Sequence, residues 1–504
     1  MMESKVSRRL QQATAQEVCD HIYLPRLNRE FGSGFDYLSD INQAHLLMLL
    51  RAGLMPREPA IHLARALQRM EREGAAAVPL DPQREDAYFN YEAHLMGLAG
   101  SEVGGRLHVA RSRNDILATH DRLRARDAGL NVLDGLNAVR EVAISRAEQY
   151  ADVVMPGYTH LQSAQPITYG HYLAAAADAI ARDAARIEQA LAHIDACPLG
   201  AGALAGTTFP IQREETARLL GFDRCVDNSL DAVASRDFAW ELMSAMTIAS
   251  LTWGRIAQDF YVWATPEFGL INFPDRVAGT SSIMPQKKNP VVVEYLKGKT
   301  SHLIALFTAS MTAVKGTHFT HSGDGNRESM RSFWESADEC VRCLALFRLV
   351  LDDAEPVEQT MLHRAKTDFS TATDLADALV RESGLSFREA HHAVGAVVYQ
   401  AIEAKLRADE ITVEMVNAAA SEQTGRDIHL DAATVQRCLD PQASVQARAA
   451  YGGPAPAQVT KRIEDLRRAL ARSRSLAASR RESIAAARST LKKEIAVLAM
   501  APLD

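Results

Sequence analysis

A long apolar stripe in the middle of the chain constrains the fold more than any other feature. Between residues 235 and 264, apolar or small side chains recur at alternating steps of four and three, at Phe238, Leu242, Ala245, Ala249, Thr252 and Ile256. This spacing places them on one face of a helix. About thirty residues at ~1.5 Å each extend for about 45 Å. A helix of that length with one apolar face requires other long helices beside it.

The rest of the chain favours an all-α fold. Residues 169–194 and 301–314 repeat the helical period, and the alternation typical of strands is nearly absent. The chain has 504 residues with only 28 Gly and 18 Pro, and at roughly 100–200 residues per domain it holds about three domains. We predict an N-terminal helical domain over 1–114, a central helical bundle over 115–365 and a C-terminal helical domain over 366–504.

Charge and hydropathy exclude several classes of partner. The net charge of −7 provides no basic surface for nucleic acid or an anionic membrane. The chain begins with polar residues rather than a signal peptide, and its apolar runs are too short to cross a membrane. Six cysteines are too few for a disulfide framework. We therefore expect a soluble, cytoplasmic protein with no nucleic-acid or membrane partner.

Two patterns allow both a functional and a structural interpretation. Cys340 and Cys343 form a C-x-x-C pair, but no second ligand pair lies nearby to complete a zinc site. We predict two helical cysteines one turn apart. Residues 461–493 carry many Lys and Arg without interleaved aromatics. We interpret this segment as a helix with a polar face rather than an anion-binding surface, and its predicted buried side consists of Ile463, Leu466, Leu470 and Leu491.

Three short segments carry residues capable of chemistry. Residues 280–290 read T-S-S-I-M-P-Q-K-K-N-P, in a segment longer than most helix connections, which favours a mobile catalytic loop over about 274–290. Residues 157–162 read G-Y-T-H-L-Q, and we predict them at the start of a helix. Residues 108–115 read H-V-A-R-S-R-N-D, in which a guanidinium and an amide stand side by side to bind a carboxylate.

Taken in chain order, 108–115, 157–162 and 280–290, the three segments resemble the three active-site regions of the aspartase/fumarase superfamily. Members of this superfamily add or remove fumarate across a carbon–nitrogen or carbon–oxygen bond. Within it, the chain is most similar to argininosuccinate lyase. Further likeness lies in residues 228–233, 236–238, 372–377, 387–391 and 451–456. The resemblance implies a homotetramer with a twenty-helix core and active sites shared between subunits. It implies a small dicarboxylate or aspartate-derived substrate and no metal or organic cofactor.

The resemblance also implies a role for each matching residue. Ser281 matches the loop serine that removes a proton from the carbon next to a carboxylate. His160, paired with a glutamate at Glu294, matches the histidine that assists departure of the amine. Lys287 matches a group that stabilises the charged intermediate. The positions that match substrate-binding residues are Ser112, Arg113, Asn114, Thr159, Gln162 and Asn289.

The segment that binds the amine half departs from argininosuccinate lyase. The family pattern has Tyr, Gln and Lys where this chain has His321, Asn326 and Ser329, and a polar residue has become Ile116. We therefore expect a carbon–nitrogen lyase whose amine product is not arginine. The relative whose pattern is most similar is ethylenediamine-N,N'-disuccinate lyase, which releases fumarate from two aspartates linked by a diamine. His321 and Arg327 are then expected to bind the second succinyl group.

Two other interpretations stay open. One is a true argininosuccinate lyase, because the overall likeness is strong. The other is a catalytically silent, crystallin-like structural protein, which needs no intact site. A fumarate assay separates the three classes.

Overall fold

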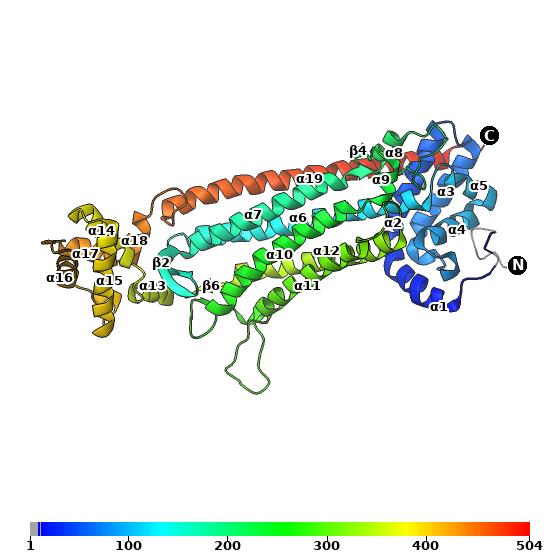
Figure 1. Cartoon of the computed structure of the whole chain (residues 1–504). Coiled ribbons are helices and arrows are strands. Elements are labelled where there is room, and N and C mark those ends of the chain that lie inside the picture. Colours follow the sequence, from blue (N-terminus) through cyan, green and yellow to red (C-terminus); the bar gives the residue numbers. More distant parts are fainter. Residues whose placement is uncertain (1–8, 11, 504) are drawn as a thin grey trace.

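The computed structural model describes residues 9, 10 and 12–503. Long helices lie side by side and form an elongated bundle (Figure 1). The bundle helices are α6 (Arg113–Gln149), α7 (Tyr169–Ile194), α10 (Asp237–Trp263), α11 (Val291–Val314), α12 (Ser329–Asp353) and, along one side, α19 (Pro456–Met500). The expected helical class is confirmed. No helix in the described part of the chain combines the length and the apolar character needed to cross a membrane.

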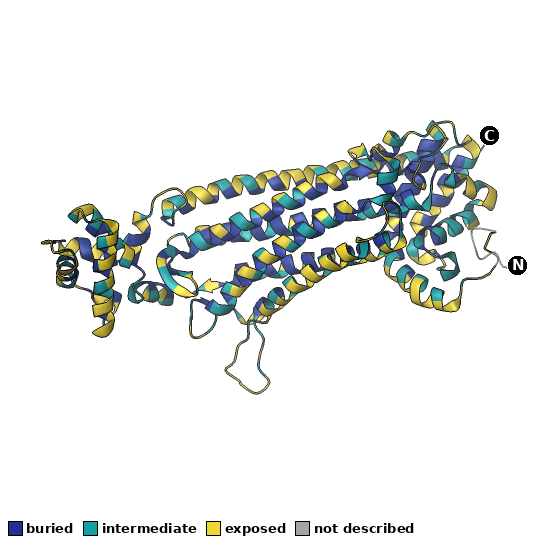
Figure 2. Ribbon diagram, viewed as in Figure 1, coloured by how far each residue is buried: buried dark blue, intermediate teal, exposed yellow. Residues whose placement is uncertain are grey.

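One apolar core runs along the bundle. The stripe residues Phe238, Leu242, Ala245, Ala249 and Ile256 are all buried in it. The helices predicted over 235–264 and 169–194 are confirmed as α10 and α7, while the helix predicted over 301–314 starts earlier, at Val291. Cys340 and Cys343 are buried in α12, as expected for structural cysteines. Figure 2 shows buried residues inside the bundle and exposed residues along the outer side of α11.

Two further cores lie at the ends of the bundle. At one end, α2 (Leu24–Arg51), α3 (Arg57–Glu73) and α4 (Ala87–Ala99) pack with the last turns of α19. At the other end, α14 (Ala372–Ser383), α15 (Phe387–Glu403), α16 (Val413–Thr424) and α17 (Ala432–Leu439) form the third core. The shorter helices are α1 (Gln16–Val18), α5 (Ser101–Gly105), α8 (Arg213–Leu219), α9 (Ser229–Ala234), α13 (Glu358–Thr367) and α18 (Pro441–Ala447).

The basic helix α19 is attached to the bundle on both its apolar and its charged side. The four residues predicted to be buried, Ile463, Leu466, Leu470 and Leu491, are buried. Its arginines form ion pairs with carboxylates of α6 and α7, such as Arg474 with Glu141 (2.6 Å) and Arg462 with Asp178. The predicted domain boundaries stay a prediction, and α19, which they assign to the C-terminal domain, contributes to the first two cores.

The segment 157–162 is a hairpin tip and not the start of a helix, so that prediction was wrong. β1 (Val154–Thr159) and β2 (Gln162–Thr168) pair antiparallel, and His160 and Leu161 form the turn with φ of 55° and 57°. Two-residue hairpin turns of this kind need positive φ at both positions and usually carry Asn-Gly. His-Leu contains neither residue, so the sequence held no hairpin signal.

The remaining strands are very short and make two more two-stranded sheets. They are β3 (Ala196–Cys197) with β4 (Arg224–Cys225), which run parallel, and β5 (Ile271–Asn272) with β6 (Glu355–Pro356), which run antiparallel.

Replacing a buried leucine of α19 should destabilise the whole bundle. Leu466→Ala is expected to lower the free energy of unfolding by about 2–5 kcal/mol, because Leu466 is 1% exposed and its removal leaves a cavity. The control is Leu476→Ala, at a position 48% exposed on the same helix, with an expected change within about 0.5 kcal/mol. Urea unfolding measures both. Equal losses would contradict the packing of α19 described above.

Candidate active site

The predicted site segments lie far apart within one chain. Ser112 caps the first turn of α6, whereas Thr159 and His160 lie at the hairpin tip that follows the last turn of the same helix. α6 has 37 residues, and at ~1.5 Å per residue it is about 55 Å long. In Figure 1, β2 and the start of α6, near α2 and α9, lie at opposite ends of the bundle. One chain alone therefore does not bring these segments together.

The turn that begins α6 is held by reciprocal hydrogen bonds. Ser112 Oγ accepts a hydrogen bond from Asn114 N (3.3 Å), and Asp115 Oδ1 accepts one from Ser112 N (2.9 Å). This capping box satisfies backbone N–H groups that the first turn of a helix leaves without partners. Ser112, Arg113 and Asn114 consequently sit on a turn of defined geometry.

Asp115 also attaches a second loop to this turn. Its other oxygen, Oδ2, accepts hydrogen bonds from Gly200 N (2.9 Å) and Gly202 N (3.0 Å). Asn114 Nδ2 adds a bond to Ala203 O (3.1 Å). Burial raises the pKa of Asp115 to about 6. The sequence analysis missed this role, because nothing in the pattern linked residue 115 to a loop more than eighty residues later.

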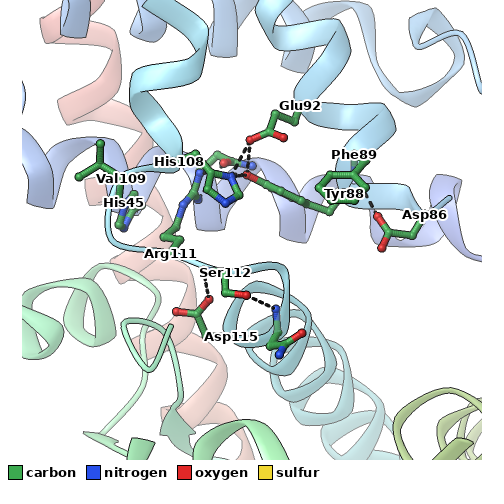
Figure 3. Close-up of polar contacts among 12 residues, drawn as sticks. His45, Asp86, Tyr88, Phe89, Glu92, His108, Val109, Arg111, Ser112 and Asp115 are labelled. Atoms are coloured by element: carbon green, nitrogen blue, oxygen red, sulfur yellow. Dashed lines mark hydrogen bonds and ion pairs between the residues drawn. The ribbon is translucent and has the colours of Figure 1, made fainter. Parts of the chain in front are cut away.

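A buried polar network supports the turn from the side of α2 and α4 (Figure 3). Arg111, only 8% exposed, donates to Asn42 Oδ1 (2.9 Å) and to Tyr88 Oη (3.3 Å). Tyr88 in turn donates to Glu92 Oε1 (2.9 Å), which also hydrogen bonds with His108 Nδ1 (2.8 Å). These hydrogen bonds hold the backbone that leads into Ser112, although the buried Nε of Arg111 has no partner among the described residues.

Arg113 is paired with acids of its own chain. Its Nη1 lies 2.8 Å from Glu85 Oε2 and 3.0 Å from Asp86 Oδ2, and its guanidinium lies 4.5 Å from the centre of the Phe89 ring. Those two carboxylates offset its charge within one chain. Its predicted role as a carboxylate ligand stays a prediction.

The loop predicted to be catalytic projects from the bundle between α10 and α11 (Figure 1). Gly279 and Asn289 exchange two backbone hydrogen bonds (2.8 and 2.9 Å), which close the base of the loop. Ser281 Oγ accepts hydrogen bonds from the backbone N–H of Met284 (3.1 Å) and of Ile283 (3.4 Å). Donors directed at an oxygen favour its negatively charged form. This geometry would help a serine to act as a base.

The other predicted residues of the loop and of the start of α11 make no hydrogen bond with the hairpin in the described part of the chain. Lys287 and Glu294 are exposed, and Asn289 Nδ2 donates to Thr280 O (3.2 Å). Gln162 is exposed beside Thr159 at the hairpin tip. Among the residues that the structure describes, no hydrogen bond joins His160 to Glu294.

His321 and Arg327 lie at the end of the bundle where α6 begins. His321 Nδ1 accepts a hydrogen bond from Asn326 Nδ2 (2.8 Å). Burial, followed by the nearby guanidinium groups of Arg236, Arg327 and Arg113, lowers the pKa of His321 to about 4. His321 is therefore neutral at neutral pH. The residues predicted to bind the amine half thus lie close to the turn that carries Arg113.

Comparisons with known proteins identify the family. A family profile described as "Lyase" matches residues 40–304, and one described as "Argininosuccinate lyase C-terminal" matches residues 369–446. The chain belongs to the fumarate lyase superfamily. The likeness to argininosuccinate lyase that the sequence motifs predict is confirmed. The protein is a lyase, as expected.

Similar proteins carry two different names. Argininosuccinate lyase 1 from Shouchella clausii is 38% identical over 463 residues, 92% of this chain and 93% of the relative. The crystal structure of EDDS lyase in complex with formate is 32% identical, with a TM-score of 0.87 over 97% of this chain and 96% of the other. An EDDS lyase variant with bound fumarate is 31% identical, with a TM-score of 0.87 over 99% of both chains.

His321 should make the protein less stable in acid. Unfolded histidine binds a proton below a pKa of about 6.5, whereas folded His321 does so only below about 4. Acid therefore favours the unfolded state, and the stability that His321 contributes is lost as the pH falls from about 6.5 through 4. His321→Asn, which keeps an acceptor for Asn326, should reduce this loss.

Urea unfolding at pH 7.5 and at pH 5 measures the effect, with exposed His302→Asn as the control. If His321→Asn and the unmodified protein lose the same stability between the two pH values, the half-buried, neutral imidazole of His321 is refuted.

Proposed function

We propose that this protein is a carbon–nitrogen lyase that releases fumarate from an N-substituted aspartate by β-elimination, with ethylenediamine-N,N'-disuccinate as substrate. One observation carries the proposal: the residues matching the fumarate half of the site are retained, whereas His321, Asn326 and Ser329 replace the arginine-binding set. The EDDS lyase structures, at 32% identity over nearly the whole chain, support this choice.

The mechanism follows from where charge develops. Ser281 removes the proton next to a substrate carboxylate, assisted by the two backbone N–H groups directed at its Oγ. The resulting doubly charged intermediate needs fixed donors. Lys287 and Asn289 supply donors on the loop, and the matching carboxylate-binding residues on the other segments are Ser112, Arg113, Asn114, Thr159 and Gln162. His160, oriented by Glu294, assists departure of the amine.

The amine half is the part of the substrate that distinguishes the alternatives. Loss of hydrogen-bond partners for a charged substrate end costs about 1.5–3 kcal/mol per contact. An arginine moiety bound as the amine half would lose up to three hydrogen-bond partners, whereas a second succinyl group would gain Arg327 as a partner. Argininosuccinate lyase is the alternative, favoured by the relative at 38% identity. The remaining alternative is a catalytically silent, crystallin-like structural protein.

We infer a homotetramer with shared active sites. The α6 turn, the hairpin and the catalytic loop do not meet in one chain, so each site takes them from three subunits. The bundle also exposes large apolar side chains, which mark a contact surface: Ile248 and Leu251 on α10, Tyr295, Ile304 and Met311 on α11, and Val341 on α12. Five helices from each of four chains, α6, α7, α10, α11 and α12, would form a twenty-helix core.

Fumarate absorbance in the ultraviolet should rise with ethylenediamine-N,N'-disuccinate and rise much less with argininosuccinate. Ser281→Ala serves as the blank, because removal of the base should abolish nearly all turnover while the exposed loop leaves the fold unaffected. Fumarate from argininosuccinate alone would establish the alternative enzyme. Fumarate from neither substrate, or full activity of Ser281→Ala, would contradict the proposed function or its base.

A further inference from the structure

A small, partly open cavity of about 40 Å³ lies behind His321, where α2, α6 and α12 meet the start of α10. Four of the side chains that line it are guanidinium groups from separate parts of the chain: Arg26, Arg124, Arg236 and Arg327. Two carboxylates, Glu30 and Asp121, also line it. Positive groups therefore outnumber negative ones around a space the size of a few water molecules.

Both carboxylates are already paired. Arg26 Nε lies 2.8 Å from Glu30 Oε2, and Arg236 Nε lies 3.0 Å from Asp121 Oδ2. Arg327 makes no hydrogen bond or ion pair with any residue that the structure describes. Arg124 likewise forms no ion pair with a described residue, although Asp121 and Glu30 lie near it and Asp86 lies near Arg327.

Some of the donors are buried without an acceptor. Arg236 is 1% exposed, and its Nη2 has no hydrogen-bond partner; the buried Nη1 of Arg26 also lacks one. Buried polar groups in folded proteins are nearly always hydrogen bonded. Burial and then the nearby Arg26 lower the pKa of Arg327, so the cavity disfavours further positive charge. Donors of this kind are suited to an anionic acceptor.

We propose that this cavity is an oxyanion subsite that binds a carboxylate carried by the amine half of the substrate. Forked guanidinium donors match the two oxygens of a carboxylate, and the volume admits one such group but not a whole substrate. His321 and Asn326 line the cavity, and His321 lies near enough to Arg113 of the α6 turn for that charge to lower its pKa. The inference rests on the proposed function and adds Arg26, Arg124 and Arg236 to the residues that select the substrate. A free inorganic oxyanion such as phosphate offers the same acceptor oxygens as a carboxylate and could bind the same guanidinium groups.

The test compares ethylenediamine-N,N'-disuccinate with N-(2-aminoethyl)aspartate, which lacks only the second succinyl group. The unmodified enzyme should prefer the disuccinate in kcat/KM by tenfold or more. Arg327→Gln should lower kcat/KM about tenfold more for the disuccinate than for the monosuccinate, mainly through KM. The control, Arg331→Gln, lies exposed on α12 and should keep the preference. If Arg327→Gln does not fold, Arg26→Gln replaces it.

A second arm uses inorganic phosphate as the probe and melting temperature as the readout. Phosphate that raises the melting temperature of the unmodified protein but not of Arg327→Gln supports the subsite. If phosphate stabilises only the unmodified protein but both proteins show the same substrate preference, the subsite binds a free oxyanion and not the substrate. Equal preference and equal phosphate response in both proteins would overturn the proposal. If neither substrate yields fumarate, the proposed function fails, and the phosphate arm alone decides whether an oxyanion binds.

Discussion

The continuous helix α6 is the constraint on which the rest of the structure depends. Its first turn carries Ser112 and Asn114, and the hairpin with His160 follows its last turn, so its rigidity keeps them about 55 Å apart. A monomer with this bundle has predicted active-site side chains at both ends, but neither end has the complete set of them. The length that lets α6 pack with α7, α10 and α12 is thus also the basis of our proposal that several copies build each site.

Positive charge is concentrated where an anion would bind. The chain has a net charge of −7, and the arginines of α19 are used in ion pairs with bundle carboxylates. Arg113 is paired with Glu85 and Asp86. Four guanidinium groups line the cavity behind His321 with only two carboxylates, which suits this part of an acidic protein to an anionic group.

Much of this could be predicted from the sequence, because the relevant signals are local. The apolar period identified α10 and α7 to within a few residues, and the spacing inside S-S-I-M-P-Q-K-K-N identified the family. The hairpin at His160 was missed because its turn lacks the usual residues, and only tertiary pairing of the strands forces both φ values positive. The contacts of Asp115 and the arginine cavity were missed because they join residues from distant parts of the chain, which no single-sequence pattern brings together.

We propose that one active site needs residues from different subunits, and a mixture of two inactive variants tests this arrangement. His160→Asn and Asn114→Ala should each lose about 100-fold or more in turnover, through loss of the proton donor and of a donor to the intermediate. After the two are unfolded together and refolded, about a quarter of the sites should have both residues intact, since each is supplied independently by a random subunit. Recovery of activity towards that fraction supports the account. A mixture no more active than the separate variants would contradict it.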